Sequence, residues 1–220
     1  MSYLSQIPQS NEMLSSSEVT LVNPSPPTKL TFTKPGTLNN TLLLDNRPYF
    51  KVATLDPAGA RTTITDAQTN ELLVTIKRKS FQSDTIKFAH RYGGKSVKQK
   101  DWLVAGNMED GSPKWTIQTS VGDFIWRRDI VYRLALCPEN DIEHPVAYCQ
   151  FPTLEDRSIS WALLLTRGTE SFRDEIVASF LILEQVLRIE EKNLGVSGYI
   201  MSNMQAQMAF NFSAASMFGT

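Results

Sequence analysis

The feature that most constrains the fold of this 220-residue chain is a helical segment near the end of the sequence that is apolar on every side. A surface helix shows one apolar stripe facing the core and a polar face opposite to it. Residues 176–183 instead place apolar side chains all round the helix axis, with Ser179 as the only polar member. The segment is too short to cross a bilayer, which needs about 20 apolar residues. We therefore expect a helix that is enclosed by the rest of the fold.

Polar and charged residues mark both ends of this helix. Ser171 is suited to the N-cap position, and Asp174 and Glu175 follow in the first turn, where negative charge suits the positive end of the helix dipole. Basic residues, among them Lys192, lie near the other end. The pattern predicts a helix over residues 171–192.

The sequence before this helix is typical of antiparallel β-structure, with short runs of β-branched, aromatic and leucine residues between turn formers. In the run 71–79, Val74 and Ile76 share one face while Thr75 and Lys77 share the other, so one face is buried and the other exposed. About a dozen such strands need closure or folding over to protect their edges, which favours a barrel. The predicted strands span residues 30–33, 41–44, 49–54, 61–65, 71–79, 84–89, 96–98, 101–104, 114–118, 123–127, 130–136, 146–151 and 158–165.

Composition divides the chain into three parts. Residues 1–28 are rich in Ser, Pro, Asn and Gln and predict a flexible arm. Residues 29–193 form the predicted barrel with its central helix. Residues 194–220 contain no charged side chain and several methionines. Two interpretations of this last segment stay open: a partly disordered or loosely docked tail, or an adaptable methionine-rich surface for a protein partner or for self-association.

Charge and cysteine content exclude some classes of partner. With 22 Lys and Arg against 23 Asp and Glu, the formal net charge is -1, so no general field attracts nucleic acid and we expect none as a partner. Residues 1–17 lack the basic and apolar regions of a secretory signal, so we expect an intracellular, cytoplasmic protein. There, Cys137 and Cys149 are expected to be small, buried or half-buried apolar residues, with a disulfide between them as the alternative.

Several segments together resemble a known family. They are residues 29–32, 39–42, 49–52, 61–64, 83–88 and 174–180. Over residues 29–192 the chain resembles a family of small, uncharacterised proteins of mushroom-forming (basidiomycete) fungi, which is grouped with the tubby C-terminal-like superfamily. The resemblance implies a tubby-like antiparallel β-barrel of about twelve strands enclosing a hydrophobic helix. Relatives in the superfamily include the tubby proteins, which bind phosphoinositide headgroups, the phospholipid scramblases and the LURP-one-related proteins of plants. Fold membership alone implies little about function.

The strongest local sign of function is the basic segment 77–100, in which Asp84 is the only acid. Such a cluster is suited to anionic phospholipid or phosphoinositide headgroups at a membrane surface, where each nearby Lys or Arg contributes about 1 kcal/mol. Alternatively, these residues are solvated side chains on the outer face that protect edge strands from aggregation. The alternative function is a protein-interaction or structural module that uses the C-terminal tail or a barrel edge. The candidate headgroup ligands are Lys77, Lys79, Lys87, Arg91, Lys95, Lys98 and Lys100.

The sequence lacks the motifs that most enzymes need. It has no HExxH, P-loop, GxSxG, dinucleotide-binding or EF-hand motif, so we expect a non-enzymatic protein without cofactor, metal or catalytic residue. A pairing of Cys137 or Cys149 with His144 would need a third, orienting group. The four tryptophans lie within strand patterns and are expected in the core, because a buried indole contributes a large apolar area.

Overall fold

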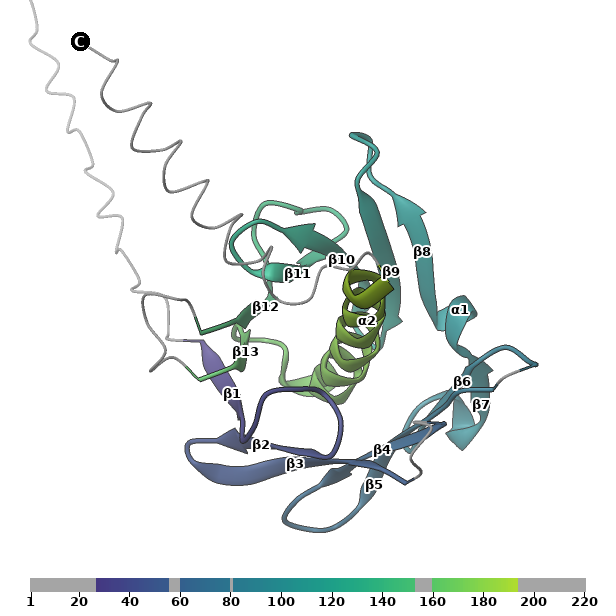
Figure 1. Ribbon diagram of the computed structural model, residues 1–220, viewed down its shortest axis with the longest axis vertical. Coiled ribbons are helices and arrows are strands. Elements are labelled where there is room, and N and C mark those ends of the chain that lie inside the picture. The colour runs from purple at the N-terminus through teal and green to yellow at the C-terminus, as the bar shows by residue number, and fades with distance from the viewer. Residues whose placement is uncertain (1–26, 56–59, 80, 153–159, 194–220) are drawn as a thin grey trace, which may run out of the picture.

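The fold is one antiparallel sheet of thirteen strands that curls around a long helix (Figure 1). The computed structural model describes residues 27–55, 60–79, 81–152 and 160–193. The predicted arm, apart from its last two residues, and the predicted tail over residues 194–220 lie outside the described residues. The strands are β1 (Thr28–Phe32), β2 (Asn40–Leu44), β3 (Arg47–Thr54), β4 (Arg61–Asp66), β5 (Leu72–Lys77), β6 (Thr85–Phe88), β7 (Ser96–Lys98), β8 (Leu103–Asn107), β9 (Pro113–Thr119), β10 (Gly122–Asp129), β11 (Arg133–Pro138), β12 (Ala147–Gln150) and β13 (Ala162–Leu165). The helical elements are the 3-10 turns η1 (Tyr92–Gly94) and η2 (Glu170–Phe172), the short helix α1 (Gln99–Trp102) and the long helix α2 (Arg173–Asn193). The prediction of a mainly antiparallel β fold is confirmed.

The sheet does not close into a complete barrel. Its strand order is β7-β6-β5-β4-β3-β2-β1-β13-β12-β11-β10-β9-β8, and every neighbouring pair is antiparallel. Because thirteen strands alternate in direction, the edge strands β7 and β8 run the same way. Parallel neighbours need a crossover of about a dozen residues or more, but α1 connects β7 to β8 with only residues 99–102. The sheet is therefore open between β7 and β8, and α1 replaces the first half of the strand predicted over residues 101–104.

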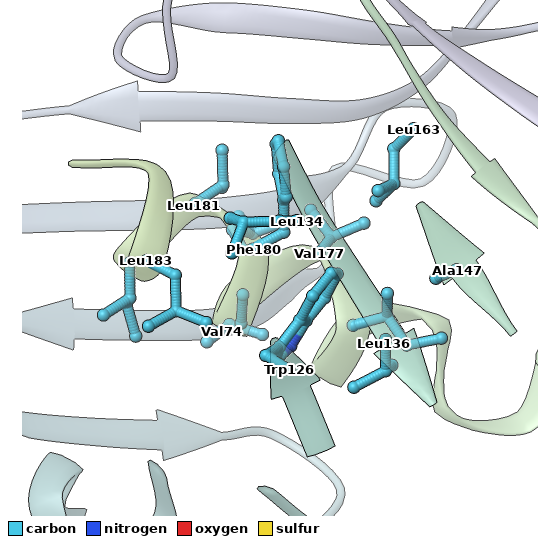
Figure 2. Close-up of a cluster of buried hydrophobic side chains, with 14 of the residues drawn as sticks. Val74, Trp126, Leu134, Leu136, Ala147, Leu163, Val177, Phe180, Leu181 and Leu183 are labelled. Atoms are coloured by element: carbon cyan, nitrogen blue, oxygen red, sulfur yellow. The ribbon is translucent and has the colours of Figure 1, made fainter. Parts of the chain in front are cut away.

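Helix α2 lies inside the curled sheet. Every residue from Glu175 to Glu184 is buried, which confirms the predicted enclosure. Figure 2 shows Val177 and Phe180 among side chains that come from the surrounding strands. The predicted N-cap is wrong, because the backbone N–H of Phe172 already donates to the carbonyl of Thr169 in the turn η2, and α2 begins only at Arg173. None of the described helices is long and apolar enough to span a membrane.

Aromatic rings connect α2 to the sheet. The ring centroid of Phe180 lies 5.9 Å from that of Phe32, 6.1 Å from that of Trp126 and 6.2 Å from that of Trp161. Trp102 is also buried, and Trp115 is partly buried against the core. The tryptophans thus belong to the core, as predicted.

Polar residues of α2 are buried too, which its apolar pattern did not predict. The Ser179 hydroxyl accepts a hydrogen bond of 2.8 Å from the Trp126 indole. The Glu184 carboxylate accepts hydrogen bonds from Arg133 Nε at 2.8 Å and from Arg188 Nε at 2.7 Å. The enclosed helix is therefore fixed by polar contacts as well as by apolar packing.

The contacts of α2 distinguish the two ends of the curled sheet. Near the start of α2, Arg173 Nη1 donates to the Tyr49 hydroxyl at 2.9 Å. Towards the end of α2, the Arg78 guanidinium donates to Gln185 Oε1. We call these ends the entry rim and the exit rim. Because the strands alternate in direction, the exit rim carries the β1–β2, β3–β4, β5–β6, β8–β9 and β10–β11 connections.

Candidate functional site

Basic side chains from neighbouring strands align on the outer surface of the sheet. Arg61 in β4 lies opposite Lys77 in β5. Lys77 in turn lies opposite Thr85 in β6, and Thr85 lies opposite Lys98 in β7. The four residues form a row across strands that are about 4.8 Å apart. We call the outer surface of β4–β7 that contains this row the basic face.

Strand alternation turns the lysines of this face outward. Ile76 in β5 and Ile86 in β6 are buried in the core. Successive side chains of a strand point to opposite faces, so Lys77 and Lys87, their neighbours in sequence, point away from the core. Both of these lysines and Lys98 are exposed.

A second row adds hydroxyl groups and borders a hollow in the surface. Thr75 lies opposite Lys87, and Lys87 lies opposite Ser96. Hydroxyl and ammonium groups both donate hydrogen bonds to phosphate oxygens. The hollow has a volume of about 430 Å³. It is lined by Arg61, Leu72, Leu73, Thr75, Lys77, Lys87, Ala89, Gly94 and Ser96.

Acidic side chains do not neutralise the lysines of the basic face. Among the described residues, Lys77, Lys87 and Lys98 take part in no ion pair. The Asp84 carboxylate accepts a hydrogen bond of 3.0 Å from the backbone N–H of Lys79. The face therefore presents three ammonium groups to any anion that reaches it.

Three other predicted ligands lie at the margin of the basic face. Lys79 is in the β5–β6 connection, where its Nζ donates to Gln82 Oε1 at 2.8 Å. Lys95 directly precedes β7 and Lys100 lies on α1, and both are exposed. These residues add positive charge around the face without lining the hollow.

Arg91 is turned away from the basic face, so we remove it from the predicted ligands. Its guanidinium forms an ion pair with Glu175 of α2 and donates to the Gln118 carbonyl at 3.0 Å. Glu175 is buried, and a buried carboxylate is costly unless a cation pairs with it. Arg91 thus compensates a charge inside the fold.

Sequence reasoning missed Arg61, Thr75 and Ser96, which line the hollow. Arg61 lies outside the basic segment 77–100 and reaches Lys77 only through the pairing of β4 with β5. The sequence did contain a signal for Arg61. In a hairpin, the start of one strand lies opposite the end of the next strand, so a residue at the start of β4 is expected to face the end of β5. The two hydroxyl residues have no comparable signal, since Thr and Ser are common on the exposed faces of strands.

The thiols and imidazoles lie in structural surroundings. Cys137 and Cys149 are free and buried, and burial raises the pKa of both thiols, which keeps them in their less reactive protonated form. His144 Nδ1 lies 2.8 Å from the Asp141 carboxylate, and this hydrogen bond raises the pKa of the imidazole. Within the described part of the chain, no cluster of three or more His, Cys, Asp or Glu residues could hold a metal ion.

A known protein family covers most of this chain. Residues 36–189 match the model of a family of unknown function, DUF6593. The chain belongs to this family. The matched DUF6593 region includes the whole basic face and α2 as far as Ile189, but it assigns no activity to either of them. No curated protein and no solved structure matches the chain.

Proposed function

We propose that this protein binds the headgroups of anionic phospholipids or phosphoinositides through the basic face, as a non-enzymatic peripheral protein of the cytoplasmic membrane surface. The observation that carries the proposal is the row of Arg61, Lys77 and Lys98, with Lys87 beside it, along a hollow of about 430 Å³. Ligand sites in proteins have volumes of roughly 300–1,000 Å³. The hollow is therefore large enough for one headgroup.

The two rows favour a headgroup with more than one phosphate. A guanidinium can bind two phosphate oxygens at once, whereas an ammonium acts as a point charge. Arg61 and Lys77, opposite each other, suit one phosphate, and Lys87 with the Ser96 hydroxyl suits a second. A phosphoinositide would use both rows, but phosphatidylserine would use only one.

We also propose that the curled sheet with its central helix is a tubby-like barrel. The support is the continuous antiparallel order of strands around an apolar helix, which is the architecture that the sequence resemblance implies. An experimental structure tests this proposal. Superposition of β1–β13 and α2 on a tubby domain in the same strand order is the expected result, and a different order would reject it.

The function is tested by flotation of the protein with vesicles that contain a phosphoinositide, at low and at physiological salt. The test variant is Lys77→Glu/Lys87→Glu. The matched control, Lys29→Glu/Lys114→Glu, makes the same change in net charge on β1 and β9. Each lysine near the surface contributes about 1 kcal/mol, so the test variant should bind roughly thirtyfold more weakly or worse. The control should bind like the wild type.

Salt and a soluble ligand complete this experiment. Binding through exposed charge should weaken with salt, because the screening length falls from about 30 Å at 0.01 M to about 8 Å at 0.15 M. Binding of a soluble inositol phosphate without binding to vesicles would indicate a free phosphorylated ligand. Equal flotation of both double variants would reject the basic face as the site.

A second candidate function is an interaction with an extended segment of a partner protein at the edge strand β8. Among the described residues this strand pairs with β9 alone, and its residues Val104 to Asn107 are exposed and uncharged. Natural edge strands usually carry lysine, proline or a bulge that prevents pairing with another chain. Such strand addition should persist at high salt and be lost in Ala105→Pro, whereas headgroup binding should be unaffected by that substitution.

A further inference from the structure

Large apolar side chains are exposed on the exit rim, beside the basic face. Phe81 in the β5–β6 connection is 100% exposed, and Leu55, directly after β3, is 59% exposed. Ile130 and Val131, in the β10–β11 hairpin at the same rim, are 67% and 68% exposed. A fully exposed phenylalanine forgoes the favourable free energy of burying its ring in this fold. The ring is therefore available to an apolar surface outside the protein.

Backbone hydrogen bonds place Leu55 and the end of β5 level with each other on the rim, with the start of β4 between them. The N–H of Leu55 donates to the carbonyl of Arg61 at 2.9 Å. The N–H of Arg78 donates to the carbonyl of Ala60 at 2.7 Å. The end of β3, the start of β4 and the end of β5 therefore lie at the same height on the exit rim. Phe81, three residues after Arg78, lies in the connection that begins there.

Lysines border the Phe81 loop. Lys77 ends β5, and Lys79 lies in the same connection as Phe81. Lys98 ends β7 at this rim, because it lies opposite Thr85 at the start of β6. An apolar tip within a border of ammonium groups matches a membrane surface, where acyl chains lie beneath anionic headgroups.

We infer that the exit rim faces the membrane, and that Phe81 and Leu55 insert among the lipids while Lys77, Lys79 and Lys98 contact anionic headgroups. This inference rests on the proposed function and adds to it the orientation of the protein and an apolar anchor. Helix α2 ends on the same rim.

The lysines favour a lipid surface over a protein partner as the occupant of this rim. The cores of protein interfaces are depleted in lysine, because burial of an ammonium group is costly. At a membrane the same ammonium groups stay at the level of the phosphates, while the apolar tip reaches below them. The composition of the rim around Phe81 thus fits the layered structure of a bilayer surface.

The inference is tested with a tryptophan at the proposed anchor. Phe81→Trp and the control Val121→Trp are mixed with phosphatidylcholine vesicles that contain phosphatidylserine and a phosphoinositide, with and without bromine on the acyl chains. Val121 is 55% exposed in the β9–β10 connection at the entry rim. We expect a blue shift and quenching by bromine for Phe81→Trp and no change for Val121→Trp. We also expect Phe81→Ser to weaken vesicle binding roughly tenfold and Val121→Ser to leave it unchanged.

The outcomes separate this inference from the proposed function. Vesicle binding in which the Phe81→Trp signal is neither shifted nor quenched would overturn the insertion and leave headgroup binding in place. Binding of soluble inositol trisphosphate without vesicle binding would also overturn the membrane orientation. If the protein bound neither the vesicles nor soluble inositol trisphosphate, the inference and the proposed function would be overturned together. The inference and the proposed function are both supported if bromine quenches Phe81→Trp but not Val121→Trp, and if Phe81→Ser still binds soluble inositol trisphosphate.

Discussion

At the scale of single residues, the ion pair of Arg91 with Glu175 compensates a charge inside the fold. Glu175 is 1% exposed on the enclosed helix α2. Removal of one partner from a buried pair leaves an uncompensated charge, at a typical cost of about 3–5 kcal/mol. We expect Arg91→Met to lower the free energy of unfolding by about 3 kcal/mol, since Arg91 itself is partly exposed. Urea unfolding followed by circular dichroism measures this change.

A double variant shows whether the unpaired charge of Glu175 causes the loss of stability in Arg91→Met. Arg91→Met/Glu175→Met removes both charges and should regain most of the stability, because no unpaired carboxylate remains inside. Headgroup binding should be unchanged in both variants, because Arg91 does not line the hollow of the basic face. A single variant as stable as the wild type would contradict the structural role of this pair.

At the scale of elements, α2 forms the centre of the core. Phe180 is fully buried among aromatic rings of the sheet. We expect Phe180→Asp to cost about 4–5 kcal/mol or more and to prevent soluble expression, since it buries an unpaired charge. Ile189→Asp is the matched control, because Ile189 lies on the same helix and is 60% exposed. Soluble yield and the circular dichroism of both variants test the enclosure of α2, and a well-folded Phe180→Asp variant would refute it.

At the scale of the whole molecule, the sheet has two edges, at β7 and β8. Within the part of the chain that the structure describes, each of these strands pairs with one neighbour, so half of its backbone groups lack a partner within the sheet. We expect the amides of β7 and β8 to exchange with solvent at least about tenfold faster than those of the interior strands β2 and β3. Hydrogen exchange followed by NMR measures this. Equal protection of all four strands would mean that the sheet closes in solution.

Features that depend on local periodicity can be predicted from the amino-acid sequence alone. An apolar pattern around all sides of residues 176–183 was enough to predict an enclosed helix, because no surface helix has this pattern. The period of two in the strand around Ile76 was enough to predict that Lys77 points away from the core. The basic composition of residues 77–100 was enough to select Lys77, Lys87 and Lys98 as candidate ligands before their positions in space were known.

Which residues meet across the fold depends on the tertiary structure. The β4–β5 pairing brings Arg61 to Lys77, whereas the contact with Glu175 takes Arg91 into the interior, although both arginines look alike in the sequence. The opening between β7 and β8 depends on the number of strands and on the short connection through α1, so no local segment of the sequence predicts it. Local patterns fix which face a side chain occupies, but its neighbours depend on pairings between distant segments, which a period of two or of 3.6 residues does not encode.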